Sequence, residues 1–318
     1  MKQPDVAVIL PAYNEALTIR QTILDFAGEL PDAHIVVIDN NSEDATGDIA
    51  RDCFKELGIR GTLLRERRQG KGNAVRKAFT EIDADIYVMA DADTTYPAKD
   101  VHKLIRPVVD GEADLVVGDR RSLGRYRQEN KRSFHDFGND LVKRLINILF
   151  ASDLKDIMSG YRVFNRVFVK NYPIMVGGFE LETDMALHAL DKRFNIIELP
   201  IDYVDRPEGS LSKLNTFQDG FRVLLTIFNI LRYYKPLYFF TLFALFFMCA
   251  GVLVGVPVIN DYIVYQYVYH VPSAILATGL EIMALMSFIV GLILDSIETN
   301  NKKRFEHRIV AFKNRKRG

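Results

Sequence analysis

Short apolar runs alternate with amphipathic stretches along roughly the first 120 residues of the chain. The runs that are typical of buried strands are DVAVILPA, HIVVID, IRGTLLRER, DIYVMADAD and ADLVVGDRR. Helical patterns follow them at about residues 15–29, after Asp44, from Lys71 and at about residues 98–110. Continuous apolar strands that alternate with helices predict a mostly parallel α/β sheet with helices on both faces.

Polar residues collect where the predicted strands end. These groups are Pro11–Glu15, Asp39, Asp91–Asp93 and Gly118–Arg121. In parallel sheets, ligands bind beyond the carboxyl ends of the strands. We therefore expect an enzyme-like cleft along this edge, with Ser42 and Asp44 placed to cap the helix after the second strand.

The pattern is less regular beyond about residue 133. Helical periodicity marks FHDFGNDLVKRLINILF and GGFELETDMALHAL, and the strand-like runs are GYRVFNR and FNIIELPIDYVDR. Residues 216–236 carry a few charges among many Phe, Leu, Ile and Tyr, which is typical of an amphipathic helix in the headgroup region of a membrane. An ordinary packed helix of the globular domain is the alternative.

Two long apolar runs lie near the C-terminus. Leu237–Val258 has no charged residue over 22 positions, and Pro272–Leu294 has Glu281 as its one ionisable residue. Since a helix needs about 20 apolar residues to cross about 30 Å of hydrocarbon, we expect a two-helix transmembrane hairpin over residues 237–296. Two buried core helices are the alternative, although core helices of this length seldom lack a polar face. Because a charge in lipid is costly, we expect Glu281 to face the other helix or an oligomer interface.

Loop charge predicts the orientation of this hairpin. The connection at residues 259–270 has no Lys or Arg, whereas both flanks are basic, including the tail at residues 297–318. Basic flanks stay in the cytoplasm. We therefore expect an integral protein of a bacterial inner or plasma membrane, with a cytoplasmic domain at residues 1–215 and a cytoplasmic tail.

The bulk composition excludes some classes of protein. The 41 Lys and Arg residues balance the 41 Asp and Glu residues, which argues against a nucleic-acid binder because such domains carry a basic excess. Cys53 and Cys249 lie in very different contexts, and no spacing of Cys and His predicts a zinc site.

The fourth strand-like run ends in two carboxylates one residue apart, Asp91 and Asp93. At the tip of a strand, both can approach one divalent ion, and Mg²⁺ or Mn²⁺ prefers oxygen ligands from carboxylates and substrate phosphates. Asp-x-Asp alone is common by chance. The competing interpretation is that Asp93 or the threonines after it cap the helix that follows Pro97, and both roles are compatible.

Several motifs together resemble a known family. They are ILPAYNEA, VVIDNNSEDAT, GKGNAVRKAF, DADTTYP, VVGDR, DIMSGYRVF and RPEGSLSKL, and the resemblance covers residues 5 to about 235. In this order they resemble glycosyltransferases of family two with the GT-A fold, specifically the polyprenyl-phosphate glycosyltransferases related to dolichyl-phosphate mannosyltransferase. The resemblance implies a Rossmann-like GT-A domain, and the two apolar runs are similar to the membrane anchors of many members.

The resemblance implies roles for residues at the strand ends. The nucleotide would be held by Pro11, Ala12, Tyr13, Glu15, Asp39, Lys71 and Asp91. Asp91 and Asp93 would hold Mg²⁺ or Mn²⁺ on the diphosphate. Several relatives have Gln as an additional metal ligand where this chain has Thr95, so the sequence departs from the family pattern there. For Glu15, stabilisation of a helix N-terminus by its charge is an equally good local explanation.

Basic residues are the implied contacts of the acceptor phosphate, because Arg binds phosphate through two parallel hydrogen bonds. The candidates are Arg120, Arg125, Arg132, Arg162, Arg206 and Lys213, and family position favours Arg120, Arg162 and Lys213 as catalytic residues. A solvated surface role is the alternative for the arginines at residues 120–132. Asp156 matches a family acid with a catalytic role, and we expect it to orient an Arg or the sugar hydroxyls. Glu180 and Glu182 are expected at the sugar or, alternatively, as acids that enrich a helix N-terminus.

The implied reaction is an inverting displacement at the anomeric carbon of a nucleotide sugar by a lipid phosphate. The expected donor is a UDP-sugar such as UDP-glucose or UDP-N-acetylglucosamine, and the expected acceptor is undecaprenyl or dolichyl phosphate at the cytoplasmic face of the membrane. A GDP-mannose-dependent mannosyltransferase and a non-catalytic membrane scaffold are the alternatives. A processive polysaccharide synthase is disfavoured, because the chain has no Trp for a Gln-x-x-Arg-Trp motif. We also expect copies of the chain to associate into a homo-oligomer through their spans.

Overall fold

The structure is a computed structural model of the 318-residue chain, and it describes residues 4–122, 133–178, 180–204 and 227–315. The chain forms two compact units. The first comprises Met1–Thr216 with Ile309–Gly318, and the second comprises Phe217–Arg308. The finer division into domain, juxtamembrane helix, hairpin and tail stays a prediction.

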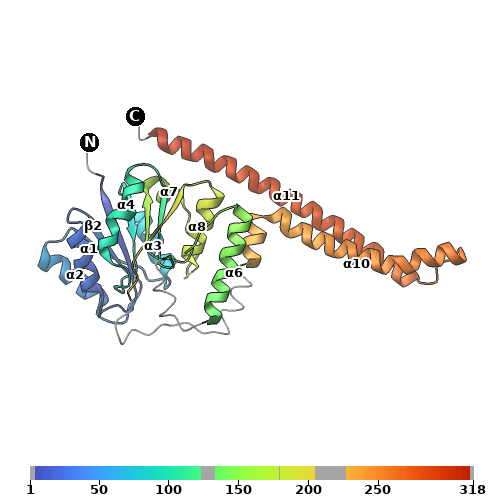
Figure 1. The fold of residues 1–318 in the computed structure, drawn as a ribbon, viewed down its shortest axis with the longest axis horizontal. Coiled ribbons are helices and arrows are strands. Elements are labelled where there is room, and N and C mark those ends of the chain that lie inside the picture. Colours follow the sequence, from blue (N-terminus) through green and yellow to red (C-terminus); the bar gives the residue numbers. More distant parts are fainter. Residues whose placement is uncertain (1–3, 123–132, 179, 205–226, 316–318) are drawn as a thin grey trace. The chain divides into compact units, whose positions relative to one another are not determined.

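Seven strands in the described part of the chain form one sheet (Figure 1). They are β1 (Val6–Ala12), β2 (His34–Asp39), β3 (Gly61–Arg65), β4 (Ile86–Met89), β5 (Leu115–Asp119), β6 (Arg162–Asn165) and β7 (Ile196–Pro200). Their order across the sheet is β3-β2-β1-β4-β6-β5-β7. Only β6 runs antiparallel to its neighbours, β4 and β5. The mostly parallel sheet predicted from the sequence is therefore confirmed.

Helices cover both faces of this sheet, as the alternating pattern predicts. One face packs against α1 (Ile19–Glu29), α2 (Thr46–Leu57) and α4 (Val101–Val109), and the other packs against α3 (Lys71–Glu81), α7 (Arg166–Asn171) and α8 (Leu181–Asp191). Successive strand residues point to opposite faces. Along β1, the fully buried Val8 and Leu10 belong to the first core, and the fully buried Ala7 and Ile9 belong to the second.

The strand order places a switch point between β1 and β4. From β1 the chain moves outward through β2 to β3, and it then returns to the other side of β1 to form β4. Open α/β sheets bind their ligands at the carboxyl ends of the strands beside such a switch point. The loops after β1 and β4 therefore frame the candidate site. A short helix, η1 (Ala98–Asp100), leads into α4, and α6 (Ser133–Phe150) precedes β6.

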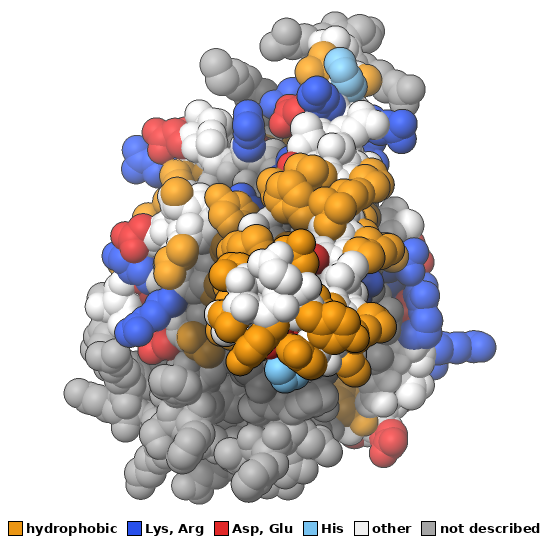
Figure 2. Space-filling view, turned by 90° about the vertical axis from the view of Figure 1, so that its right-hand side faces the viewer, with side chains coloured by type: hydrophobic (Ala, Val, Ile, Leu, Met, Phe, Trp, Pro, Cys, Tyr) orange, Lys and Arg blue, Asp and Glu red, His pale blue; other side chains and the backbone are white. Residues whose placement is uncertain are grey.

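The second unit contains two long apolar helices. In the described chain, α10 (Pro236–Tyr265) and α11 (Val271–Arg315) are long and apolar enough to cross a membrane, with mean hydropathies of 2.6 and 2.1 over their apolar windows. Hydrophobic side chains crowd the surface of these helices in Figure 2. The expectation of two C-terminal helices that could span a membrane is therefore confirmed.

Both helices are longer than predicted. α10 continues to Tyr265, so the connection expected at residues 259–270 is a short turn at residues 266–270. The tail expected at residues 297–318 is helical through Arg315 and continues α11. Hydropathy marks where an apolar surface ends, whereas the backbone hydrogen bonds of a helix can continue into water. The helix ends therefore could not be read from the apolar composition.

Glu281, the one ionisable residue of the second apolar run, lies against α10. A Cβ atom built on Gly251 would come 2.6 Å from Glu281 Oε1, so glycine leaves the room that this carboxyl group occupies. Glu281 thus faces the other helix of the pair, which is one of the two expectations. The oligomer interface stays a prediction.

Candidate active site

The loop after β4 carries the two acidic residues that were expected to bind a metal ion. Asp91 lies two residues beyond β4 with 28% of its side chain exposed, whereas Asp93 is buried. The Asp93 carboxylate accepts hydrogen bonds from the N–H of Thr95 at 3.2 Å and from its hydroxyl at 2.6 Å. Thr94 has a φ of 62°, which is rare for a β-branched residue. Asp93 therefore stabilises the turn through Oδ1, and Asp91 is the more exposed of the two carboxylates.

The interpretation of Asp93 as the cap of the next helix is wrong. That helix begins with η1 at Ala98, and no side chain caps it. Asp93 instead binds Thr95 within its own turn. Thr95, which stands where relatives have Gln, is itself buried with its hydroxyl bound to Asp93.

A lysine connects Asp91 to a second acidic residue. Lys71 is the first residue of α3, and its Nζ forms ion pairs with Asp91 and, at 2.5 Å, with Glu182. Glu182 is buried in the first turn of α8. Burial lowers the pKa of Lys71, but the charges of Asp91 and Glu182 outweigh burial and raise this pKa above its ordinary value. We call Lys71, Asp91 and Glu182 the lysine cluster.

Glycines make room for the lysine cluster. Gly70 has a φ of 127°, and a Cβ atom on Gly70 or Gly72 would overlap the backbone carbonyls of the segment before α8. On the other side, a Cβ atom on Gly160 would come 2.8 Å from Asp91 Oδ2 and 3.0 Å from Lys71 Nζ. The chain therefore approaches this cluster at three points where a larger residue would not fit without a shift.

The N-terminal end of α1 and the residue before it hold Ala92, which lies between the two acids. The carbonyl oxygen of Ala92 accepts hydrogen bonds from the hydroxyls of Thr18 at 2.8 Å and Thr22 at 3.1 Å. The Thr18 hydroxyl also lies 3.1 Å from Glu15 Oε2. Glu15, expected at the nucleotide, therefore contacts Thr18, which helps to position residues 91–95. We call these residues the acidic turn.

The loops after β1 and β2 are tied together by hydrogen bonds. The N–H groups of Asn14, Glu15 and Ala16 donate to the side chains of Ser42, Thr46 and Asp44 at 3.1, 2.8 and 3.1 Å. The expectation that Ser42 caps α2 is therefore wrong. Asp44 does support the start of α2, because it also accepts the N–H of Thr46 at 3.0 Å. The loop that these bonds hold delays the helix expected from about residue 15, and α1 begins only at Ile19.

Other residues expected at the nucleotide lie at the same edge. Asp39 ends β2 beside Ala12, the last residue of β1, and it accepts the N–H of Ser42 at 3.0 Å. Pro11 lies within β1, and Tyr13 follows that strand. Their contacts with a nucleotide stay predictions.

A second buried pair of charges follows β5. Arg120 comes directly after that strand, and its guanidinium binds Asp156 through Nε at 2.7 Å and Nη2 at 2.9 Å. The backbone N–H of Arg120 also donates to Asp156 at 3.2 Å. Burial raises the pKa of Asp156, but the charge and hydrogen bonds of Arg120 outweigh burial and hold this pKa below its ordinary value. We call Arg120 and Asp156 the arginine cluster.

Three side chains hold the segment at residues 155–160, which carries Asp156. Glu198, in the middle of β7, accepts the first two N–H groups of the segment at 2.6 and 3.0 Å. Arg162 donates to two of its carbonyl groups, through Nε at 2.8 Å and through Nη2. The hydroxyl of Tyr96 accepts its last N–H at 2.8 Å. The position of Asp156 is therefore fixed by hydrogen bonds to the backbone of its segment as well as by its pair with Arg120.

The position of Arg162 argues against direct contact with an acceptor phosphate. Its side chain is fully buried at the start of β6, and burial lowers its pKa. Nη1 has no hydrogen-bond partner among the described residues, while the other nitrogens bind backbone carbonyls. Arg162 thus supports the segment that carries Asp156 instead of facing a ligand at the surface.

Sequence reasoning missed Tyr96 and Glu198. The Tyr96 hydroxyl accepts a hydrogen bond from Gly160 N–H and lies 3.4 Å from Arg120 Nη1. Because Gly160 also lies against Asp91, Tyr96 and Gly160 stand between the two clusters. The available signals were weak: Tyr96 follows the acidic turn directly, and Glu198 interrupts an apolar strand.

The remaining expected residues are not gathered at this site by the described structure. Glu180 is exposed at the N-terminal end of α8, unlike the buried Glu182. Four candidates for the acceptor phosphate, Arg125, Arg132, Arg206 and Lys213, lie outside the described residues. Their roles stay predictions.

The acidic turn fits a hard divalent ion. Carboxylate oxygens suit Mg²⁺ and Mn²⁺, and a site with one or two carboxylates takes its other ligands from substrate phosphates and water. Across the described residues, no group of three His, Cys, Asp or Glu side chains could hold a metal by itself. An ion held by Asp91 and Asp93 would therefore depend on a phosphate-bearing ligand.

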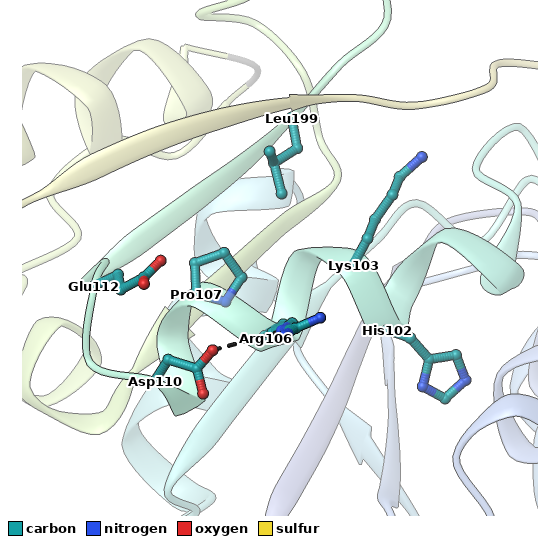
Figure 3. Close-up of a pocket in the computed structure, with 7 residues that line it drawn as sticks. All are labelled: His102, Lys103, Arg106, Pro107, Asp110, Glu112 and Leu199. Atoms are coloured by element: carbon teal, nitrogen blue, oxygen red, sulfur yellow. Dashed lines mark ion pairs between the residues drawn. The ribbon is translucent and has the colours of Figure 1, made fainter.

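A surface hollow over α4 is a separate concave feature (Figure 3). It is lined by His102, Lys103, Arg106, Pro107, Asp110, Glu112 and Leu199. Its basic side chains form ion pairs with nearby acids, such as Arg106 with Asp110 at 3.6 Å. No member of the lysine or arginine cluster lines it, so it is not part of the candidate site.

The chain matches one protein-family model and several known proteins. The model of the family described as glycosyl transferase family 2 matches residues 7–172. The chain is 29% identical over 310 residues to glycosyltransferase AglJ of Haloferax volcanii, and the match covers 96% of this chain and 99% of that protein. It is also 29% identical over 216 residues to the dolichyl-phosphate hexose transferase of Haloferax volcanii, with 68% and 89% covered.

A solved structure with the same fold is glucosyl-3-phosphoglycerate synthase from Mycobacterium tuberculosis in complex with Mn²⁺, uridine diphosphate and phosphoglyceric acid. Its TM-score to this chain is 0.56 at 22% identity, and the match covers 71% of this chain and 78% of that one. The GT-A-like α/β fold predicted from the motifs is thereby confirmed.

Proposed function

Because the chain belongs to glycosyl transferase family 2, we propose that it transfers a sugar from a nucleotide-sugar donor onto a polyprenyl phosphate at a membrane surface. The observation that carries the proposal is the meeting of the lysine and arginine clusters at Gly160 and Tyr96, beyond the carboxyl ends of the central strands. A relative named for dolichyl phosphate supports the lipid acceptor. The two apolar helices would keep the enzyme where such a lipid lies.

The donor half of the site would form around the acidic turn. Asp91 and Asp93 would hold Mg²⁺ or Mn²⁺, which when bound neutralises the charge that develops on a departing nucleoside diphosphate. Asp39 and residues Pro11–Glu15 would hold the nucleoside, since they lie at the ends of the neighbouring strands β2 and β1. Lys71 supplies a second cation beside Asp91.

The acceptor half would form around Arg120. A phosphate monoester has its second pKa near 6, so at pH 7 it is largely a dianion that needs no general base. Asp156 is held ionised and paired by Arg120, so it orients this arginine and does not abstract a proton. Arg120 in turn binds the phosphate, with Arg125, Arg132, Arg206 and Lys213 as further proposed contacts and Glu180 and Glu182 near the sugar. One displacement at the anomeric carbon inverts its configuration.

A UDP-sugar is the proposed donor, and GDP-mannose is the alternative. A protein of the same fold binds uridine diphosphate with Mn²⁺, which supports both the nucleotide and the ion. The basic flanks of the hairpin support a cytoplasmic position for the catalytic domain.

The test uses the full chain in vesicles that contain undecaprenyl or dolichyl phosphate. UDP-glucose, UDP-N-acetylglucosamine and GDP-mannose are supplied in turn with Mn²⁺, Mg²⁺ or a chelator, and lipid-linked sugar and released nucleotide are measured. We expect one donor to be consumed in a metal-dependent way, and Asp91→Asn to lower kcat/KM by at least about 100-fold while the variant still folds cooperatively. Consumption of no donor with either lipid would favour a non-catalytic scaffold. Full activity of Asp91→Asn would instead contradict the role proposed for Asp91 in the transfer.

A further inference from the structure

We propose that Lys71 is an internal competitor of the divalent ion at Asp91, and that Glu182 retains this lysine when the ion enters. This inference deepens the proposed function and rests on it, since it concerns the metal that the transfer would use. It assigns the lysine cluster to control of metal entry, so that the ion binds firmly only together with the donor.

The position of Lys71 is unfavourable for a structural lysine. It is the first residue of α3, where the helix dipole disfavours a positive charge. Its side chain is only 11% exposed, so the ammonium has also lost most of its hydration. A buried cation at a helix N-terminus is costly unless its partners compensate, and here one of the two compensating carboxylates, Asp91, belongs to the candidate metal site.

The local packing directs this lysine onto Asp91. Gly70 and Gly72 let the start of α3 lie against the segment before α8, and Gly160 leaves the space in which Lys71 meets Asp91. The Asp91 oxygen that pairs with Lys71 is Oδ1, and Oδ2 faces Gly160. The carboxylate expected to bind the ion is therefore already neutralised by a cation of the protein.

A divalent ion and an ammonium on one carboxylate repel each other strongly. Entry of the ion therefore moves Lys71 away from Asp91. Glu182, at 2.5 Å from Nζ, gives the displaced ammonium a buried partner, so its charge is not left unpaired. The flexible four-carbon stem of lysine permits this small movement. Phosphates of the donor would add ligands to the ion and compensate the lost pair.

The test measures Mn²⁺ binding to the purified full chain without nucleotide, from the loss of the electron paramagnetic resonance signal of free Mn²⁺. We expect Lys71→Met to bind Mn²⁺ about tenfold more tightly than the wild type, by analogy with the change in proton affinity caused by a neighbouring charge. Lys77→Met is the matched control. Lys77 lies on the same helix, but its ion-pair partner is Glu81, at 2.9 Å, and not a residue of the acidic turn. Its Mn²⁺ affinity should equal that of the wild type.

A double-mutant cycle separates retention of the lysine from direct metal binding by Glu182. Glu182→Gln alone should weaken Mn²⁺ binding in either case. If Glu182 only retains Lys71, the double variant Lys71→Met with Glu182→Gln binds Mn²⁺ about as tightly as Lys71→Met. If the double variant binds as weakly as Glu182→Gln, Glu182 is a metal ligand and the proposal is overturned.

Unchanged or weaker Mn²⁺ binding by Lys71→Met also overturns the proposal. Should this variant fail to fold, Lys71→Gln, which keeps a polar group between the carboxylates, is judged by the same criterion. The proposed function fails separately, if the wild type binds no Mn²⁺ even with uridine or guanosine diphosphate and Asp91→Asn changes nothing.

Discussion

The two charged clusters at the strand edge hold their cations in different ways. Lys71 binds two separate carboxylates through a single nitrogen on a flexible stem. Arg120 binds one carboxylate, Asp156, through two side-chain nitrogens and its own N–H. An ammonium can exchange partners by rotation, whereas a guanidinium bound through two nitrogens is fixed in one plane.

This difference indicates which half of the site changes during a reaction. Residues 155–160, which carry Asp156, are held by Glu198, Arg162 and Tyr96. Lys71 instead pairs with Asp91 at the acidic turn and also with Glu182, which can keep the lysine paired if the Asp91 contact is lost. We therefore expect the arginine cluster to be a fixed frame and the lysine cluster to rearrange when a donor binds.

The largest effect should come from breaking the fixed frame. Arg120→Met leaves the buried Asp156 carboxylate unpaired, which should cost about 3–5 kcal/mol of unfolding free energy at pH 7 and lower kcat/KM about 100-fold or more. The folded pKa of Asp156 lies below its ordinary value of about 3.9. The pair therefore stabilises the fold above about pH 4, and this stability is lost as the pH falls through the folded pKa. Denaturation of both proteins across this pH range measures the difference.

Arg121→Met is the matched control for this prediction. Arg121 is the next residue, and its ion pair with Asp140 is partly exposed, so its loss should cost at most about 1 kcal/mol. Equal losses in the two variants, or a deficit of Arg120→Met that does not shrink in acid, would contradict the idea of a clamped frame.

A smaller effect should come from crowding the lysine cluster without removing a charge. Gly160→Ala places a Cβ atom 2.8 Å from Asp91 Oδ2 and 3.0 Å from Lys71 Nζ, so these side chains must shift. Since small misplacements of reacting groups are costly, we expect kcat/KM to fall about tenfold. Gly28→Ala is the control, because Gly28 lies on α1 with nothing within 4 Å of its added Cβ atom. Full activity of Gly160→Ala would show that the cluster tolerates displacement better than we infer.

The sequence predicted which residues lie at the strand ends, but not all of the contacts between them. The order of apolar runs was sufficient for the parallel sheet, and the sheet itself brings Asp39 and Asp91 to one edge because parallel strands end together. The partnership of Lys71 with Glu182 could not be predicted, since it joins residues 111 positions apart through the packing of α3 against the segment before α8. From the sequence, Glu182 was equally compatible with a contact to the sugar and with an acid that stabilises a helix N-terminus.

Residues that hold the backbone of the site were harder to predict than residues that face a ligand. Arg162 has the composition of a phosphate ligand, and only its burial at the start of β6 shows that it binds backbone carbonyls instead. The antiparallel insertion of β6 between β4 and β5 causes this burial, and no periodicity reveals the insertion. Side chains that hold other loops therefore become visible only when the strand order is known.

The smallest effect should come from weakening the hydrogen bonds that Glu198 makes to the segment at residues 155–160. Glu198→Gln keeps one oxygen for the N–H groups of Lys155 and Asp156, so we expect a loss of about 1–2 kcal/mol in unfolding free energy and a decrease in kcat/KM of only about threefold. Burial raises the pKa of Glu198, so its contribution to stability is full below about pH 4.3 and declines as the pH rises through the folded pKa. The deficit of the variant should therefore be largest in acid, opposite in direction to that of Arg120→Met. Glu112→Gln, at an exposed position, should change neither quantity. A deficit that grows from acid to neutral pH would mean that the frame depends on the charge of Glu198 and not on its position.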